Sequence, residues 1–270
     1  MNRRDIAKTV IIAGAAAALG SSAAQAQAPA AASASRLNQI LARGSVRIGT
    51  TGDFNPMSFR NAGSNDYQGF DIEAMTQLAA DLGVKIEWVT TEWATLVAGI
   101  AANRFDIFSG ASVSMARART ASFTMPYLEA GTVPLSLKAN AGKFKTWESI
   151  NDPAVRVAVS MGTVFHDQAK QHFPKATIQA VQSPATGFQE VLSGRAEVTI
   201  TSNVEASTLI KRFDQLAINV EGTQMRNKRP FAYVVAHDDV TWLNYVNTWI
   251  TLKKSEGFFN SLEAKWLPTG

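Results

Sequence analysis

Hydrophobic and polar positions follow two alternating periods along the chain, which predicts strands and helices in turn. Apolar residues recur at every second position in short runs typical of strands, and at helical spacing in the longer runs between them. The first unit comprises, in order, a strand at residues 46–49, a helix at 71–82, a strand at 84–89, a helix at 93–103 and a strand at 105–108. This order predicts a mainly parallel sheet flanked by helices.

A second unit of the same kind follows in the second half of the chain. It comprises a strand at residues 155–159, a helix at 164–172, a strand at 177–181, a helix at 184–193 and a strand at 197–201. Two segments with an extended pattern, at 132–137 and 231–236, connect the units. A pair of extended crossings between two lobes is the layout of a hinge.

The expected fold class is therefore α/β, with two lobes that each contain a parallel-type sheet and are joined by a two-segment hinge. An amphipathic helix at 241–254 and a shorter helix after Gly257 end the chain, and we expect their aromatic side chains to pack in the core. The expected domains are a first lobe at 37–132 plus 236–270, a second lobe at 138–229, and hinge crossings at 133–137 and 230–235.

The amino terminus has the features of an export signal. Arg3, Arg4 and Lys8 precede an uncharged, alanine-rich run, and residues 24–26 (Ala-Gln-Ala) offer the small-x-small pattern that signal peptidase accepts. We expect residues 1–26 to be a signal peptide, of the Sec or the twin-arginine type, and residues 27–36 to be a linker. An uncleaved membrane anchor is the alternative, but the apolar run is short for a span of about 20 residues.

Composition excludes several classes of function. Lys and Arg number 26 and Asp and Glu 22, and the dispersed positive charges do not form the basic stripe that nucleic-acid binding needs. Cysteine is absent, so the chain has neither disulfides nor thiolate metal ligands. The three histidines are dispersed, which argues against a zinc site. We therefore expect no metal, no cofactor and no nucleic-acid partner.

Three loops follow the strands of the first unit, where open α/β sheets bind their ligands. They are residues 50–56, 91–93 and 109–117, and the third contains glycine and several serines and ends in Arg117. A guanidinium can bind a carboxylate through two parallel hydrogen bonds. Arg117 is thus a candidate carboxylate clamp, and the alternative is a surface arginine beside serines that cap a helix.

Longer stretches of sequence resemble a known family. Residues 47–56, 69–75, 104–117, 157–163, 193–198, 253–257 and 265–267 are similar, in order, to the family 3 periplasmic solute-binding proteins of ABC transporters, which bind polar amino acids. The resemblance covers nearly all of the chain after the signal peptide. It implies a type II periplasmic binding-protein fold, a location in the periplasm and an ABC permease in the inner membrane as partner.

The resemblance also assigns roles to single residues. Arg117 would bind the ligand carboxylate, with Ser112 and the Gly110 backbone beside it, and the backbone of Gly162, Thr163 and Val164 would meet the same carboxylate from the second lobe. Phe54 and Trp93 match the aromatic positions that sandwich the ligand, although core packing is the alternative for both.

Two departures from the family pattern bear on the ligand and on catalysis. Ser202 stands where amino-acid binders carry the aspartate that pairs with the ligand ammonium, so Glu205 or another acid substitutes, or the ligand is not an ordinary α-amino acid. Residues 150–157 and 188–197 in particular resemble the cyclohexadienyl dehydratases, which act on prephenate or arogenate, but His166 stands where these enzymes carry a general-acid glutamate.

Three functional hypotheses remain from the sequence. The first is a binding protein that closes around a small carboxylate or amino-acid-like solute for an ABC transporter. The second is a dehydratase of the cyclohexadienyl type, a carbon–oxygen lyase in which His166 or Glu205 replaces the usual acid. The third is a sensor-domain homologue that binds without transport, which no signalling segment supports.

Overall fold

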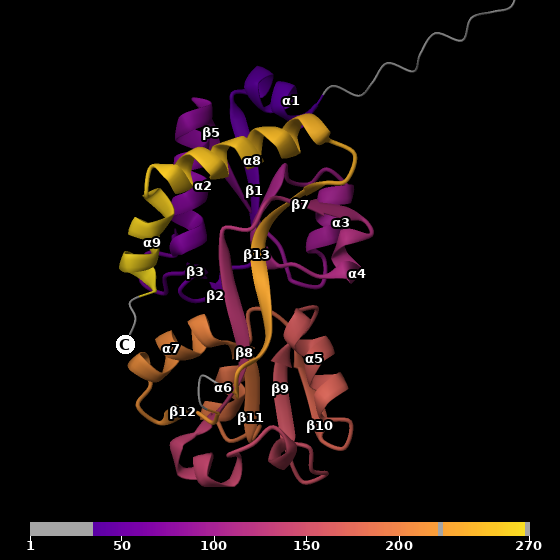
Figure 1. Cartoon of the computed structure of the whole chain (residues 1–270), viewed down its shortest axis with the longest axis vertical. Helices are drawn as coiled ribbons and strands as arrows, with labels where there is room; N and C mark the ends of the chain where they lie inside the picture. The colour runs from indigo at the N-terminus through magenta and orange to yellow at the C-terminus, as the bar shows by residue number, and fades with distance from the viewer. Residues whose placement is uncertain (1–34, 221–223, 268–270) are drawn as a thin grey trace, which may run out of the picture. The chain divides into compact units, whose positions relative to one another are not determined.

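The computed structural model describes residues 35–220 and 224–267, in which strands and helices alternate (Figure 1). The expected signal peptide and all but the last two residues of the expected linker lie outside the described residues. The strands are β1 (Ser45–Thr50), β2 (Asp53–Phe54), β3 (Ser58–Arg60), β4 (Tyr67–Gln68), β5 (Lys85–Thr90), β6 (Ile107–Ser112), β7 (Ala121–Phe123), β8 (Leu128–Leu137), β9 (Arg156–Ser160), β10 (Thr177–Val181), β11 (Val198–Ser202), β12 (Leu216–Ile218) and β13 (Arg226–Ala236).

The helices lie between these strands and at the carboxyl end. They are α1 (Arg36–Arg43), α2 (Phe70–Leu82), α3 (Leu96–Ala101), α4 (Met115–Ala118), α5 (Val164–His172), α6 (Gly187–Leu192), α7 (Asn203–Arg212), α8 (Val240–Ser255) and α9 (Phe258–Trp266), with 3-10 turns η1 (Lys138–Lys143) and η2 (Glu148–Ile150). No helix of the described part is long and apolar enough to cross a membrane.

Most strands join one path of paired strands, in the order β10-β9-β11-β8-β13-β6-β1-β5. The pairs at its two ends are parallel, as the strand–helix pattern predicts: β1 pairs with β5 and β6, and β9 pairs with β10 and β11. The long strands β8 and β13 lie side by side in the middle and pair antiparallel, which makes the sheet mixed (Figure 1). The two expected hinge segments are thus parts of these two strands.

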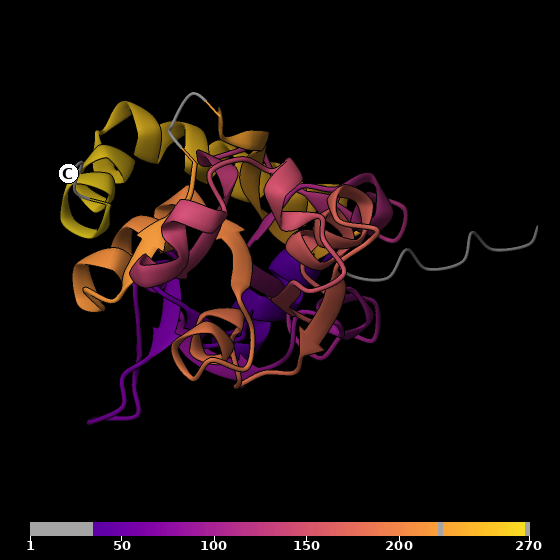
Figure 2. The ribbon, with the colours of Figure 1, turned by 90° about the horizontal axis from the view of Figure 1, so that it is seen from below.

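Hydrophobic side chains form separate cores at the two ends of this path. The core at one end includes Ile48, Phe70, Leu78, Tyr233 and Trp242, and a second cluster around Phe105 and Val234 lies on the opposite face of the same strands. The core at the other end includes Val157, Phe173, Val198 and Leu209, and helices surround its strands (Figure 2). We call the parts around these cores lobe 1 and lobe 2; the exact lobe boundaries given above stay a prediction.

Three expected elements differ from the structure in ways that matter for the site. The helix expected at 93–103 begins at Leu96, so Trp93 lies in the turn before it, and the helix expected at 184–193 begins at Gly187. The loop expected at 109–117 is strand as far as Ser112, because β6 pairs with β13 through Phe231 and Ser112. The short helix α4, capped by the Ser114 side chain, then carries Arg117.

A buried ion-pair cluster ties α1 to the strands of lobe 1. Asp106 has no exposed side-chain area, and its oxygens lie 2.5 Å from Arg43 Nη2, 2.6 Å from Arg47 Nη2 and 4.0 Å from Arg36 Nη1. The Arg47 backbone amide also donates to Asp106 Oδ2 at 2.8 Å. The carboxylate is thus fully compensated by cations and donors of the chain itself, as a buried charge requires.

Candidate functional site

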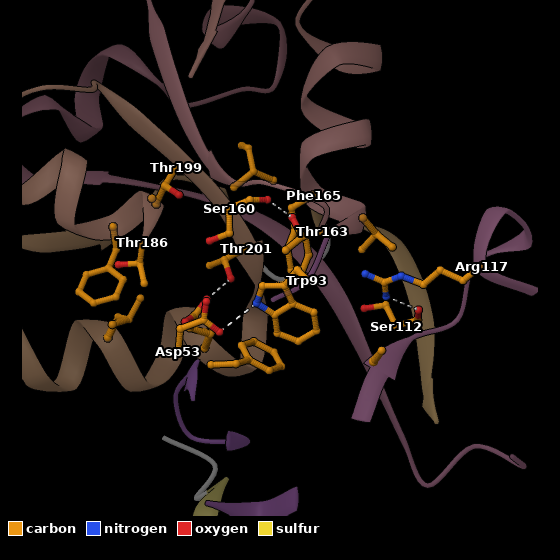
Figure 3. Close-up of a pocket in the computed structure, with 18 residues that line it drawn as sticks. Asp53, Trp93, Ser112, Arg117, Ser160, Thr163, Phe165, Thr186, Thr199 and Thr201 are labelled. Carbon is orange, nitrogen blue, oxygen red and sulfur yellow. Dashed lines mark hydrogen bonds between the residues drawn. The ribbon is translucent and has the colours of Figure 1, made fainter. Parts of the chain in front are cut away.

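A cavity with an empty volume of about 620 Å³, including space that opens to solvent, lies between the two lobes. Lobe 1 lines it with residues of β2, β6, α4 and the turn before α3, and lobe 2 with residues of β9, β11 and the starts of α5, α6 and α7 (Figure 3). These positions follow the carboxyl ends of parallel strands, where open α/β sheets bind ligands.

Arg117 lines one end of this cavity, and only 9% of its surface is exposed. Its guanidinium donates to the Ser112 carbonyl at 3.2 Å and, across the cleft, to the Gly162 carbonyl at 3.0 Å. No acidic side chain among the described residues forms an ion pair with it. Burial lowers the pKa of Arg117 to about 10, and the negative charge of Asp167 partly opposes this lowering. Arg117 is therefore a buried cation that lacks a counter-charge.

Aromatic rings form the wall of the cavity on the lobe 1 side. Phe54 meets Trp93 edge-on with ring centroids 5.8 Å apart, and Trp93 in turn packs against Phe108. The Arg117 guanidinium carbon lies 6.0 Å from the centre of the Trp93 ring, and Trp93 Nε1 donates to Asp53 Oδ1 at 2.9 Å. Trp93 therefore stands between Arg117 and Asp53 (Figure 3).

Two acidic side chains line the cavity beyond Trp93. Asp53 accepts hydrogen bonds from Trp93 and, across the cleft, from the Ser183 hydroxyl, and Glu205 accepts one from the Thr201 hydroxyl. Burial raises the pKa of Glu205 to about 8; the hydrogen bond from Thr201 opposes this rise and the charge of Asp53 adds to it. Glu205 is thus largely protonated at neutral pH.

Hydroxyl groups of lobe 2 line much of the remaining wall, from Ser160, Thr163, Thr186, Thr199 and Thr201. Thr199 is 3% exposed and Ser112, on lobe 1, is 8% exposed. Neither of these two hydroxyls has a hydrogen-bond partner among the described residues. Both therefore offer unused hydrogen-bonding capacity to whatever fills the cavity.

The structure brings most of the sequence-predicted site residues to one place. Six of them line the cavity; their contact with a ligand stays a prediction: Phe54, Trp93, Ser112, Arg117, Thr163 and Val164. The Val164 position begins α5, whose Thr163 cap accepts a hydrogen bond from the backbone amide of His166.

Three predicted residues do not line the cavity. Gly110 turns toward the core, where a side chain would collide with Tyr127 and Asp71. Gly162 lies where the lobes come so close that a side chain would meet the Ala94 backbone, and it contributes its carbonyl to Arg117. Ser202 is 1% exposed and caps α7, because its hydroxyl accepts from the Glu205 amide at 3.1 Å.

His166, the general acid considered from sequence, does not line the cavity either. Its side chain is half-buried on α5, where burial, and then the charge of Lys170, lower its pKa. Of the two acids that the sequence offered for catalysis, Glu205, named there only as a substitute, does line the cavity. Ligands bind at the carboxyl ends of parallel strands, which is how residues 109–117 were identified, and the same reasoning applied to β11 points to residues 201–205. The proximity of Glu205 to Asp53 has no such signal, because it depends on how the two lobes pack.

Comparisons with known proteins agree with this architecture. The family model for bacterial extracellular solute-binding proteins, family 3, matches residues 46–269. Cyclohexadienyl dehydratase of Pseudomonas aeruginosa is 33% identical over 239 residues, covering 86% of each chain. L-cystine-binding protein TcyJ of Escherichia coli is 27% identical over 232 residues, covering 85% of each chain.

The same fold occurs in a solved structure. The crystal structure of an ancestral amino acid-binding protein, a precursor of cyclohexadienyl dehydratase, matches with a TM-score of 0.80 and 35% identity, covering 85% of this chain and 98% of that one. The expected fold class, the type II two-lobed periplasmic binding fold, is thereby confirmed. On sequence and structure together, the chain belongs to the bacterial extracellular solute-binding proteins, family 3.

Proposed function

We propose that this protein captures a small carboxylate-bearing, amino-acid-like solute in the periplasm and delivers it to an ABC permease. The observation that carries the proposal is Arg117, a cation more than nine-tenths buried at the wall of a cleft and without an acidic partner among the described residues. Leaving a buried charge uncompensated costs several kcal/mol, and a ligand carboxylate removes that cost. Family membership and relatives named as amino-acid-binding or cystine-binding proteins support this function.

Closure of the two lobes would retain the solute. Hydrogen bonds already cross the cleft from Arg117 to the Gly162 carbonyl, from Ser183 to Asp53, and from Gln182 to Glu92 at 3.1 Å. A ligand that contacts both lobes adds interactions that the open form lacks, and it shifts the population toward the closed form. Export through the expected signal peptide at 1–26 would bring the protein to the compartment where this capture takes place.

The test is calorimetric titration of the protein without residues 1–26 with a panel of amino acids and simple carboxylates. Arg117→Ala should weaken the binding of every ligand found by at least a hundredfold, which corresponds to about 2.7 kcal/mol. Arg119→Ala is the matched control, because Arg119 is exposed on the same turn and does not line the cavity. Undiminished affinity in Arg117→Ala would contradict the clamp.

A second candidate function is a dehydratase of the cyclohexadienyl type, and Glu205 is the observation that favours it. A carboxyl group with a pKa of about 8 carries a proton at neutral pH, and it can give that proton to a departing hydroxyl. Incubation with prephenate and arogenate tests this: product formation that Glu205→Gln abolishes and His166→Ala retains would establish catalysis by Glu205. Absence of phenylpyruvate and phenylalanine would leave the binding function alone.

A further inference from the structure

The two ends of the cavity carry opposite charges. Arg117 supplies the cation at one end, and Asp53 lies at the other (Figure 3). Glu205, which is hydrogen-bonded to Thr201, lies close enough to Asp53 to feel its charge. Trp93 separates the ends, since its Nε1 donates to Asp53 while Arg117 lies over the ring. The acid whose charge acts on Arg117 is Asp167, outside the cavity, rather than either of the cavity acids.

This separation limits where a ligand can carry a positive charge. The Arg117 guanidinium contacts the carbonyls of Ser112 and Gly162, and neither Asp53 nor Glu205 lies within ion-pair distance of it. An α-ammonium group, one carbon away from a carboxylate bound to Arg117, would therefore lie on the neutral side of the cavity. An ammonium buried there would lose its hydration without gaining an anionic partner. The acidic residues of the cavity, which could pair with a cation, lie instead on the far side of Trp93.

The acidic end is also prepared for a cation by its own surroundings. Asp53 is oriented by hydrogen bonds from Trp93 and Ser183, and Glu205 by one from Thr201, so both carboxyl groups are held in place. No basic side chain among the described residues forms an ion pair with either of them. The unpartnered Thr199 hydroxyl, 3% exposed, lines the same cavity and offers a further hydrogen bond.

We infer that Asp53 and Glu205 form a subsite for a cationic group at the end of the ligand remote from its carboxylate, so that the favoured ligands are ω-amino or ω-guanidino carboxylates without an α-ammonium group. This inference rests on the proposed function, since Arg117 must hold the carboxylate. It assigns affinity to Arg117 and selectivity to the acidic pair. A cation between the two carboxyl groups favours the ionised form of Glu205 and so restores the charge that burial disfavours.

Four ligands of nearly equal length test the inference by calorimetry at pH 7. They are δ-aminovalerate, with a distal ammonium; γ-guanidinobutyrate, with a distal guanidinium; valerate, with neither; and norvaline, with an α-ammonium. The two ligands with a distal cation should bind at least tenfold more tightly than valerate or norvaline. Equal or tighter binding of norvaline would overturn the inference.

Variants then assign the effect to the acidic pair. Asp53→Asn and Glu205→Gln should each weaken the binding of δ-aminovalerate at least tenfold and leave that of valerate unchanged or stronger. Glu92→Gln is the matched control, because Glu92 accepts a hydrogen bond from Gln182 across the cleft and does not line the cavity. A loss in Glu92→Gln as large as that in Asp53→Asn would show a role in closure only, and would overturn the subsite. Thermal unfolding of each variant shows that it is folded.

The outcomes separate this inference from the proposed function. If valerate and δ-aminovalerate bind equally and both lose affinity in Arg117→Ala, the carboxylate clamp stands and the cationic subsite is wrong. If none of the four ligands binds, the favoured ligand class is overturned, and the wider panel of carboxylates then decides the proposed function.

Discussion

Asp106 and Glu205 are both buried acidic groups, but the chain surrounds them in opposite ways. Three arginines, two from α1 and one from β1, converge on Asp106, and a backbone amide completes its hydrogen bonds. Glu205 receives one hydrogen bond, from Thr201, and no described cation pairs with it. The first site is electrostatically complete, whereas the second is incomplete.

The same contrast holds between arginines. Arg47 pairs with Asp106 at 2.6 Å, while Arg117 donates only to two backbone carbonyls. Charges that serve the fold are compensated within the chain, and charges that serve binding are left for a partner to compensate. An unpaired buried charge at a cavity wall therefore points to function more strongly than a buried charge as such.

The largest effect on stability is expected in the ion-pair cluster around Asp106. Asp106→Asn leaves three guanidinium groups without their anion, so the free energy of unfolding should fall by about 3–5 kcal/mol, as for other broken buried ion pairs. Urea titration of the ligand-free protein measures it. Asp238→Asn, at an exposed turn near the same cluster, should change stability by about 0.5 kcal/mol or less. Similar losses in both variants would contradict the special role of Asp106.

The second prediction exchanges an arginine for methionine in each region. Arg47→Met should lower the free energy of unfolding by about 1–3 kcal/mol, because it removes a cation and several hydrogen bonds from Asp106. Arg117→Met should leave stability unchanged or raise it by about 1 kcal/mol, since it removes an uncompensated buried charge. Urea titration measures the free energy of unfolding of both variants. A loss of stability in Arg117→Met would contradict the difference between the two arginines.

The smallest expected effect is a pH dependence from Glu205. Its pKa of about 8 in the folded protein lies above the ordinary value of 4.5, so between these values the folded state retains a proton that the unfolded state has lost. Stability must then decrease as pH rises from about 4.5 to 8. Opening of the cleft would hydrate Glu205 and reduce the effect to about 1 kcal/mol.

Thermal unfolding across this pH range measures the effect. The difference in melting temperature between Glu205→Gln and the unchanged protein should grow in favour of the variant as pH rises. A constant difference would show that Glu205 ionises normally in the folded state.

The fold followed from sequence wherever local pattern determines structure. The helix expected at 164–172 and the strand expected at 177–181 coincide with α5 and β10, because their patterns are strongly periodic and bounded by turns. The loop expected after residue 108 was wrong because β6 is extended by pairing with Phe231, a contact between residues more than one hundred positions apart. Non-local pairing of this kind leaves no signal in a local pattern.

The candidate site divides in the same way. Arg117, Phe54 and Trp93 were identified from strand ends and from the family resemblance, and all three line the cavity. Glu205 was offered only as a substitute and Asp53 was not identified, because the two residues belong to different lobes and share a cavity only through the packing of the lobes. Ser202 was expected in the cavity, but its hydroxyl is used to cap α7, a competition that only the structure reveals.

Because the chain crosses between the lobes twice, through β8 and β13, the two cores are completed at different points along the sequence. The core of lobe 2 draws on one continuous stretch, from Val133 to Val220, whereas that of lobe 1 combines residues from Ile40 to Ala130 with residues from Phe231 to Leu262. A chain that emerges amino end first can complete lobe 2 while lobe 1 still lacks Trp242, Trp249 and Phe259. The lobe 1 side of the Arg117 pocket therefore cannot be completed before the last forty residues are synthesised, and the protein becomes competent to bind only after these residues have packed.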